Sequence, residues 1–164
     1  MSNEIQDATR AALRRLALRD RTELEVQRLL QAKGFSQEIV KGTLERLKAW
    51  GYLNDVRVAM AMTLDRLERS GWGPARVKQE LARRGVDPMV VSAVVAQVME
   101  GRDEEGLAKA AARRYVRAHP GVAGQRGLRR LAGYLGRRGY SAEVIARVIK
   151  GYAAGDGLDI GGGA

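Results

Sequence analysis

Apolar residues recur at intervals of three and four along most of the chain, the spacing that places side chains on one face of an α-helix. Glycines and residues typical of helix N-caps separate these stretches, so the pattern predicts a succession of short helices. Each is too short to be stable alone, and each must bury its apolar face against neighbouring helices. The expected helices occupy residues 4–18, 24–32, 37–50, 56–70, 75–84, 88–100, 103–118, 126–137 and 142–152.

The segment 88–100 leaves an alternative open because five of its residues are valines. Branching at Cβ restricts the side-chain rotamers in a helix and favours strands. The register of the surrounding sequence favours a helix, and a strand is the alternative.

A stretch of eleven residues occurs three times with the same chemistry in the same positions. The copies read L-Q-A-K-G-F-S-Q-E-I-V from residue 30, L-A-R-R-G-V-D-P-M-V-V from 81, and L-G-R-R-G-Y-S-A-E-V-I from 135. In each, a basic residue suits the carbonyl end of a helix, and the next residue is a glycine that can adopt a left-handed conformation. A Ser or Asp then suits the start of the next helix. The three glycines are Gly34, Gly85 and Gly139.

These copies, about fifty residues apart, predict an internal repeat of three helices. The expected fold is all-α, an elongated and curved tandem array of three three-helix repeats. The repeats are expected to span residues 4–53, 54–101 and 102–152, followed by a flexible glycine-rich tail at 153–164.

Local features refine this picture. Thr22 and Glu25 have the spacing of a capping box, and Asn54 or Asp55 can cap the following helix. We expect Phe35, Tyr52 and Tyr140 to pack at helix corners. Trp72 lies between two glycines, and we expect it to be exposed.

Composition argues against several classes of function. The chain has no cysteine and a single histidine, His119, which argues against a zinc or haem site, and we expect no cofactor. Neither a phosphate-binding glycine loop nor a Ser-His-Asp set is present, so the chain is not expected to be an enzyme. We find no membrane span or signal peptide and expect a cytoplasmic protein with no membrane contact.

The net charge of +10 points to acidic partners, above all nucleic acid. This charge is uneven, since residues 102–150 carry twelve basic and four acidic residues. Two helices in this repeat each carry a basic stripe opposite the apolar face. We expect phosphate or acidic-protein contact there, sensitive to salt and not specific for sequence. The residues proposed for DNA contact are Arg126, Arg129, Arg130, Arg137 and Arg138, followed by Lys109, Arg113 and Arg117.

Two motifs in the middle of the chain resemble those of the RecX family of bacterial recombination regulators. They are G-Y-L-N-D at residues 51–55 and G-W-G-P at 71–74, followed by Glu80, Leu81 and R-R-G at 83–85. The resemblance is specific over residues 13–85 and looser to residue 152. It implies a protein that binds the RecA nucleoprotein filament, restrains its ATPase and DNA strand-exchange activities, and also binds DNA.

On this interpretation the chain is a monomeric, non-enzymatic modulator of RecA that binds single- or double-stranded DNA weakly. Arg76, Arg83 and Arg84 in the middle repeat are the candidates for filament contact. A helix-turn-helix-like regulator that binds DNA without RecA is the alternative, and a scaffold without affinity for DNA is a third possibility.

Overall fold

The computed structural model describes residues 2–122 and 124–155, and every regular element in these residues is a helix. Helix α6 includes the valine-rich segment, so the helix prediction there is confirmed. Val91, Val94, Val95 and Val98 are buried, which shows that burial outweighs the modest helix propensity of valine. The helices are α1 (Ser2–Leu16), α2 (Glu23–Ala32), α3 (Gln37–Ala49), α4 (Asp55–Glu68), α5 (Pro74–Arg83), α6 (Pro88–Met99), α7 (Glu104–Ala118), α8 (Gly124–Arg138) and α9 (Ala142–Ala154).

The three repeated stretches form the same kind of corner between the second and third helices of each repeat. Their glycines have φ values of +85°, +82° and +86°, which confirms the predicted left-handed conformation. The Ser36 and Ser141 side chains accept hydrogen bonds from Ile39 N and Val144 N, both at 3.4 Å, and so cap α3 and α9. Hereafter the first corner is Lys33, Gly34 and Phe35, the second is Arg84, Gly85 and Val86, and the third is Arg138, Gly139 and Tyr140.

The chain divides into two compact units. The first comprises Met1–Met62 and Glu80–Val94, and the second comprises Thr63–Gln79 and Val95–Ala164. The middle repeat is therefore divided between the units: the second corner belongs to the first unit, and the start of α5 belongs to the second unit. The all-α tandem repeat is confirmed, whereas the exact repeat boundaries and the curvature stay predictions.

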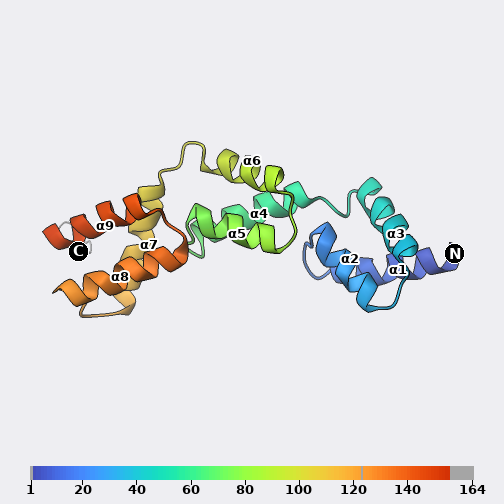
Figure 1. The fold of residues 1–164 in the computed structure, drawn as a ribbon, viewed down its shortest axis with the longest axis horizontal. Coiled ribbons are helices and arrows are strands. Elements are labelled where there is room, and N and C mark those ends of the chain that lie inside the picture. Colours follow the sequence, from blue (N-terminus) through green and yellow to red (C-terminus); the bar gives the residue numbers. More distant parts are fainter. Residues whose placement is uncertain (1, 123, 156–164) are drawn as a thin grey trace, which may run out of the picture. The chain divides into compact units, whose positions relative to one another are not determined.

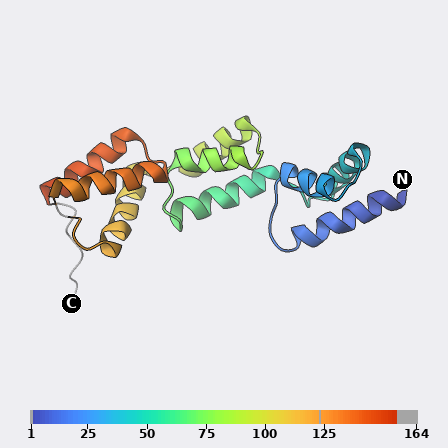
Figure 2. The same cartoon turned by 60° about the horizontal axis from the view of Figure 1, so that its bottom comes forward.

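In the first unit α1, α2 and α3 pack together, as both views show (Figure 1, Figure 2). Alanines on α1 allow a close approach of α3, whose buried side chains face the same core. The capping box of Thr22 and Glu25 at the start of α2 is present, as predicted. The buried residues of this core are Ala8, Ala11, Ala12, Val26, Leu30, Ile39, Val40, Leu44, Leu47 and Leu53.

In the second unit α7, α8 and α9 pack around a second core (Figure 1). Alanines again line the inner face of the first helix, and leucines and valines fill the space between the other two. Helix α9 continues to Ala154, and the remainder of the predicted tail, 156–164, lies outside the described residues. The buried residues of this core are Ala108, Ala111, Ala112, Leu131, Leu135, Tyr140, Val144 and Val148.

The aromatic predictions had mixed outcomes. Tyr140 is buried and Phe35 packs partly buried against the first core, as expected. The prediction for Tyr52 was wrong: the residue is 51% exposed, because the next residue, Leu53, enters the core in its place. Exposure of Trp72 was also wrong, since its ring is half-buried.

Candidate functional site

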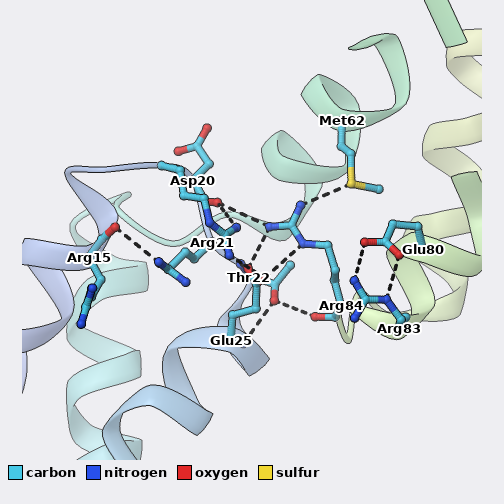
Figure 3. A network of polar contacts seen from close by, with 10 residues as sticks. Arg15, Asp20, Arg21, Thr22, Glu25, Met62, Glu80, Arg83 and Arg84 are labelled. Atoms are coloured by element: carbon cyan, nitrogen blue, oxygen red, sulfur yellow. Dashed lines mark hydrogen bonds and ion pairs between the residues drawn. The ribbon is translucent and has the colours of Figure 1, made fainter. Parts of the chain in front are cut away.

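The second corner packs on the first turn of α2, within the first unit (Figure 3). The Thr22 hydroxyl donates a hydrogen bond of 2.7 Å to the Arg84 carbonyl, and the Arg84 guanidinium forms an ion pair of 2.8 Å with Glu25. A Cβ on Gly85 would lie 2.6 Å from the Leu24 Cβ. Gly85 is therefore required both for its positive φ and for the close approach of α2.

The ion pair between Arg84 and Glu25 is largely shielded from solvent, since the two side chains are 13% and 21% exposed. Burial alone would raise the pKa of Glu25. Hydrogen bonds from Arg84, the Thr22 backbone and Arg19 outweigh it and lower the pKa to about 2. Arg84 also donates to the Asp20 carbonyl, so its side chain is committed to internal bonds.

Asn54 and Asp55 of the G-Y-L-N-D motif cap two different helices. Asn54 Oδ1 accepts from Arg57 N at 2.9 Å and caps α4, which is one of the two predicted possibilities. Asp55 Oδ1 instead accepts from Glu23 N at 2.9 Å, at the start of α2. Burial raises the pKa of Asp55, with the Glu23 hydrogen bond opposing it. The motif therefore joins two repeats of the first unit, which local sequence alone did not reveal.

The third corner packs in the same way on the start of α5, within the second unit. Gly73 N donates a hydrogen bond of 2.6 Å to the Arg138 carbonyl. A Cβ on Gly139 would lie 2.5 Å from the Arg76 Cβ, and the Arg138 guanidinium donates to the Ser70 carbonyl. The second and third corners thus dock on the second helix of the preceding repeat by one arrangement.

Tyr140 completes this third corner. Its hydroxyl lies 3.2 Å from the Gly71 carbonyl and 3.3 Å from the Leu107 carbonyl, where it can donate a hydrogen bond. Burial raises the pKa of Tyr140 to about 12, because the phenolate would lose its hydration.

The G-W-G-P motif builds the surface that receives the third corner. A Cβ on Gly73 would lie 2.6 Å from Tyr140 N, so only glycine permits this approach. Two guanidinium groups lie over the Trp72 ring, that of Arg66 at 4.9 Å and that of Arg76 at 4.1 Å from the ring centre. These cation–π contacts explain why Trp72 is half-buried.

The three residues predicted for filament contact have different surroundings. Arg76 donates to the Arg137 carbonyl at 2.9 Å and stacks over Trp72. Arg83 is 74% exposed and pairs with Glu80 at 2.6 Å, whereas Arg84 lies inside the network described above (Figure 3). Filament contact through these residues stays a prediction, and for Arg84 it would require breaking an internal ion pair.

The third repeat carries its positive charge away from its acidic residues. Residues 106–142 contain nine basic residues and no acidic residue. The four acidic residues of 102–150 lie at the starts of α7 and α9, where Asp103 caps α7 and Glu104 accepts from Ser141 N at 2.8 Å. Carboxylates therefore stabilise helix starts and leave the cations of α8 without an acidic neighbour in sequence.

The predicted DNA-contact residues divide into two groups. Three of them have partners within the chain. Lys109 pairs with Glu105 at 2.7 Å, and Arg129 donates to Gln125 at 3.3 Å. Arg138 stacks 4.9 Å over the Tyr134 ring and also donates to the Ser70 carbonyl. The other five side chains are exposed and form no ion pair or hydrogen bond with any described residue. These free arginines are Arg113, Arg117, Arg126, Arg130 and Arg137.

A cavity of 440 Å³ lies among α7, α8 and α9 and was not predicted. Val116, Leu128 and Tyr152 contribute to its largely apolar lining. Burial raises the pKa of Tyr152, against the effect of the positive charges of Arg113 and Arg117. The free arginines of α7 therefore lie close to one wall of this cavity, a placement that no sequence pattern indicated.

Two further observations bear on chemistry. In residues 2–122 and 124–155, no three His, Cys, Asp or Glu side chains gather as they would to hold a metal ion. The described helices also include none with the length and apolar character needed to cross a membrane.

The fold and this surface define a tandem three-helix repeat protein with a basic final repeat. Family models for the first, second and third three-helix domains of RecX match residues 8–47, 54–95 and 103–149. The chain belongs to the RecX family of regulatory proteins.

Individual relatives agree with this assignment. The regulatory protein RecX of Trichlorobacter lovleyi is 37% identical over 150 residues, which cover 91% of this chain and 97% of that protein. RecX of Halorhodospira halophila is 38% identical over 136 residues, 82% of this chain and 81% of that protein. The fold itself is similar to the crystal structure of RecX from Lactobacillus salivarius, which superimposes with a TM-score of 0.78 at 18% identity, covering 92% of this chain and 97% of that chain.

Proposed function

We propose that this protein binds the RecA nucleoprotein filament and restrains its ATPase and DNA strand-exchange activities. Membership of a family of regulatory proteins supports a regulatory role, and the motifs at residues 51–55 and 71–74 resemble those of RecA modulators. The protein is expected to act as a cytosolic monomer.

The observation that carries the proposal is the cluster of free arginines in the third repeat. Five exposed guanidinium groups without internal partners among the described residues occur in a stretch of 37 residues that has no carboxylate side chain. Guanidinium groups bind phosphate oxygens with charge-assisted hydrogen bonds. A nucleoprotein filament offers such phosphates in a regular array, and binding to them requires no sequence selectivity.

The test replaces Arg126, Arg130 and Arg137 together by glutamate. RecA-dependent ATP hydrolysis on single-stranded DNA is measured with increasing amounts of wild-type or variant protein. We expect strong inhibition by the wild type and at least a tenfold higher concentration for half-inhibition by the variant. The salt dependence of DNA binding should also flatten, by roughly 0.7 in logarithmic slope for each phosphate group that the variant no longer binds.

A matched control reverses Arg28, Lys41 and Lys78, which are exposed and outside the third repeat. Its net charge equals that of the test variant, so a purely long-range electrostatic effect would weaken both equally. Equal inhibition by all three proteins would overturn the role of the basic surface. If the wild type binds duplex DNA tightly and selectively but leaves RecA unaffected, the protein is a DNA-binding regulator that acts alone.

A further inference from the structure

The two docked corners share three features. The carbonyl of the basic residue accepts a hydrogen bond from the start of a helix, at 2.7 Å from Thr22 Oγ1 and 2.6 Å from Gly73 N. The glycine allows that helix to approach where a Cβ would overlap it. The guanidinium group of Arg84 or Arg138 then binds oxygen atoms next to the same helix start. A corner of this kind is therefore a receptor for the N-terminal turn of a helix.

The first corner has the same sequence pattern and backbone conformation, but no described helix is docked on it. Gly34 has a φ of +85°, and a Cβ built there meets no described atom within 4 Å. Lys33 is exposed, and no donor among the described residues reaches its carbonyl. The first corner is thus formed by its own repeat alone. Its Lys33 carbonyl, its Lys33 side chain and Gly34 have no docked helix among the described residues.

The surroundings of the first corner favour an acidic ligand. A cavity of 380 Å³ opens beside it, lined by Lys33 and Phe35 and by residues of α1 that include Arg10 and Arg14. Arg10 pairs with Asp7 at 2.9 Å, whereas Arg14 has no ion pair with any described residue. Lys33 and Arg14 therefore offer two cations to a carboxylate next to the free corner.

In a second copy of this chain, the second helices of the repeats, which are the kind of helix that the docked corners receive, offer no free position for the first corner. The starts of α2 and α5 are already occupied by the second and third corners. In α8 the position equivalent to Thr22 and Gly73, counted back from the corner glycine, is Gly127, and it is covered: a Cβ there would lie 2.7 Å from Val122 Cα. Since the docked corners receive second helices and no second helix of another copy is free at this position, we take the occupant of the first corner to be a helix of another protein.

We infer that the first corner binds the exposed N-terminus of an α-helix on a protein partner. That helix start would carry a hydroxyl or glycine N–H donor at its N-cap and a carboxylate in its first turn, as α2 does with Thr22 and Glu25. The Lys33 carbonyl accepts the N-cap hydrogen bond, Gly34 contacts the helix backbone and the Lys33 ammonium pairs with the carboxylate. The inference rests on the proposed function in that it takes RecA as the protein that presents this helix.

The experiment measures the affinity of the full chain for RecA filaments on single-stranded DNA, using Lys33→Glu and Gly34→Ala. Each variant has a matched control: Lys41→Glu is an exposed charge reversal in the same repeat, and Gly51→Ala has a φ of +75° with no described atom near its Cβ. Lys33→Glu should weaken filament binding about tenfold or more, because a charge-assisted hydrogen bond is lost. Gly34→Ala should also weaken it, because the added Cβ would overlap the docked helix as it would at Gly85 and Gly139. Lys33→Arg should keep full affinity, because the other two corners use arginine.

Binding to DNA without RecA should not differ between each test variant and its matched control, which separates the corner from the basic surface. If Lys33→Glu and Gly34→Ala bind filaments as well as their controls do, the corner inference fails while the proposed function stands. If the wild type does not bind filaments at all, both fail. A lower thermal midpoint for Gly34→Ala that is matched by Gly51→Ala reports backbone strain, and Lys33→Glu then decides the question.

Discussion

Replacing Arg84 by methionine tests whether the second corner is held by its ion pair. Methionine keeps much of the length of the side chain but leaves the largely buried Glu25 carboxylate without its main partner. The lowering of the Glu25 pKa from 4.5 to about 2 corresponds to roughly 3 kcal/mol between its two protonation states. Arg84 supplies part of this, and some solvent reaches the pair, so we expect the free energy of unfolding to fall by about 2 kcal/mol.

Urea unfolding followed by far-ultraviolet circular dichroism measures this decrease. Arg83→Met is the control, because Arg83 is the neighbouring residue, has the same charge and forms its ion pair in solvent. It should leave the unfolding midpoint unchanged. A double-mutant cycle with Glu25→Gln should give a coupling free energy above about 1 kcal/mol. Equal midpoints for Arg83→Met and Arg84→Met, or no coupling, would refute the argument that this pair holds the corner.

Three further predictions concern stability. Because the folded-state pKa of Glu25 is depressed, its carboxylate contributes fully to the free energy of unfolding above pH 4.5, and this contribution is lost as the pH falls toward 2. When stability is measured as the pH is lowered from 5 to 2, Glu25→Gln should therefore lose less stability than the wild type. Gly73→Ala should destabilise the protein because its Cβ would overlap the third corner. Gly151→Ala is the contrast, because Gly151 lies within α9 and a Cβ there would meet no described atom; urea unfolding should show a free energy of unfolding higher by about 0.5–1 kcal/mol. Tyr140→Phe should cost about 1 kcal/mol because the phenol hydrogen bond is removed, and ultraviolet titration of this variant should no longer show one tyrosine ionising near pH 12.

Local chemistry explains why so much of the fold was predictable. Glycine at the corners, Ser36 and Ser141 at helix starts and the Thr22–Glu25 capping box each act within one turn of the chain. The tyrosines were harder to place. Tyr52 and Tyr140 both follow a corner-type glycine closely, yet the first is 51% exposed and the second 5%, because only the second lies beneath a neighbouring repeat.

The candidate site shows the same division. The sequence identified the basic third repeat, since an excess of arginine requires no coordinates to be counted. It could not separate Arg138, which holds a corner together, from Arg137, whose side chain is free of described partners. Both belong to the same R-R-G triplet, and successive helical residues point about 100° apart.

By itself, then, the sequence determined the helices, their caps and the threefold repeat, because these depend on residues close together in the chain. Only the tertiary structure decided which corners are docked and which arginines remain available to a partner. Those outcomes depend on interactions such as that of Arg84 with Glu25, 59 residues apart, and such interactions form only when one repeat packs on another.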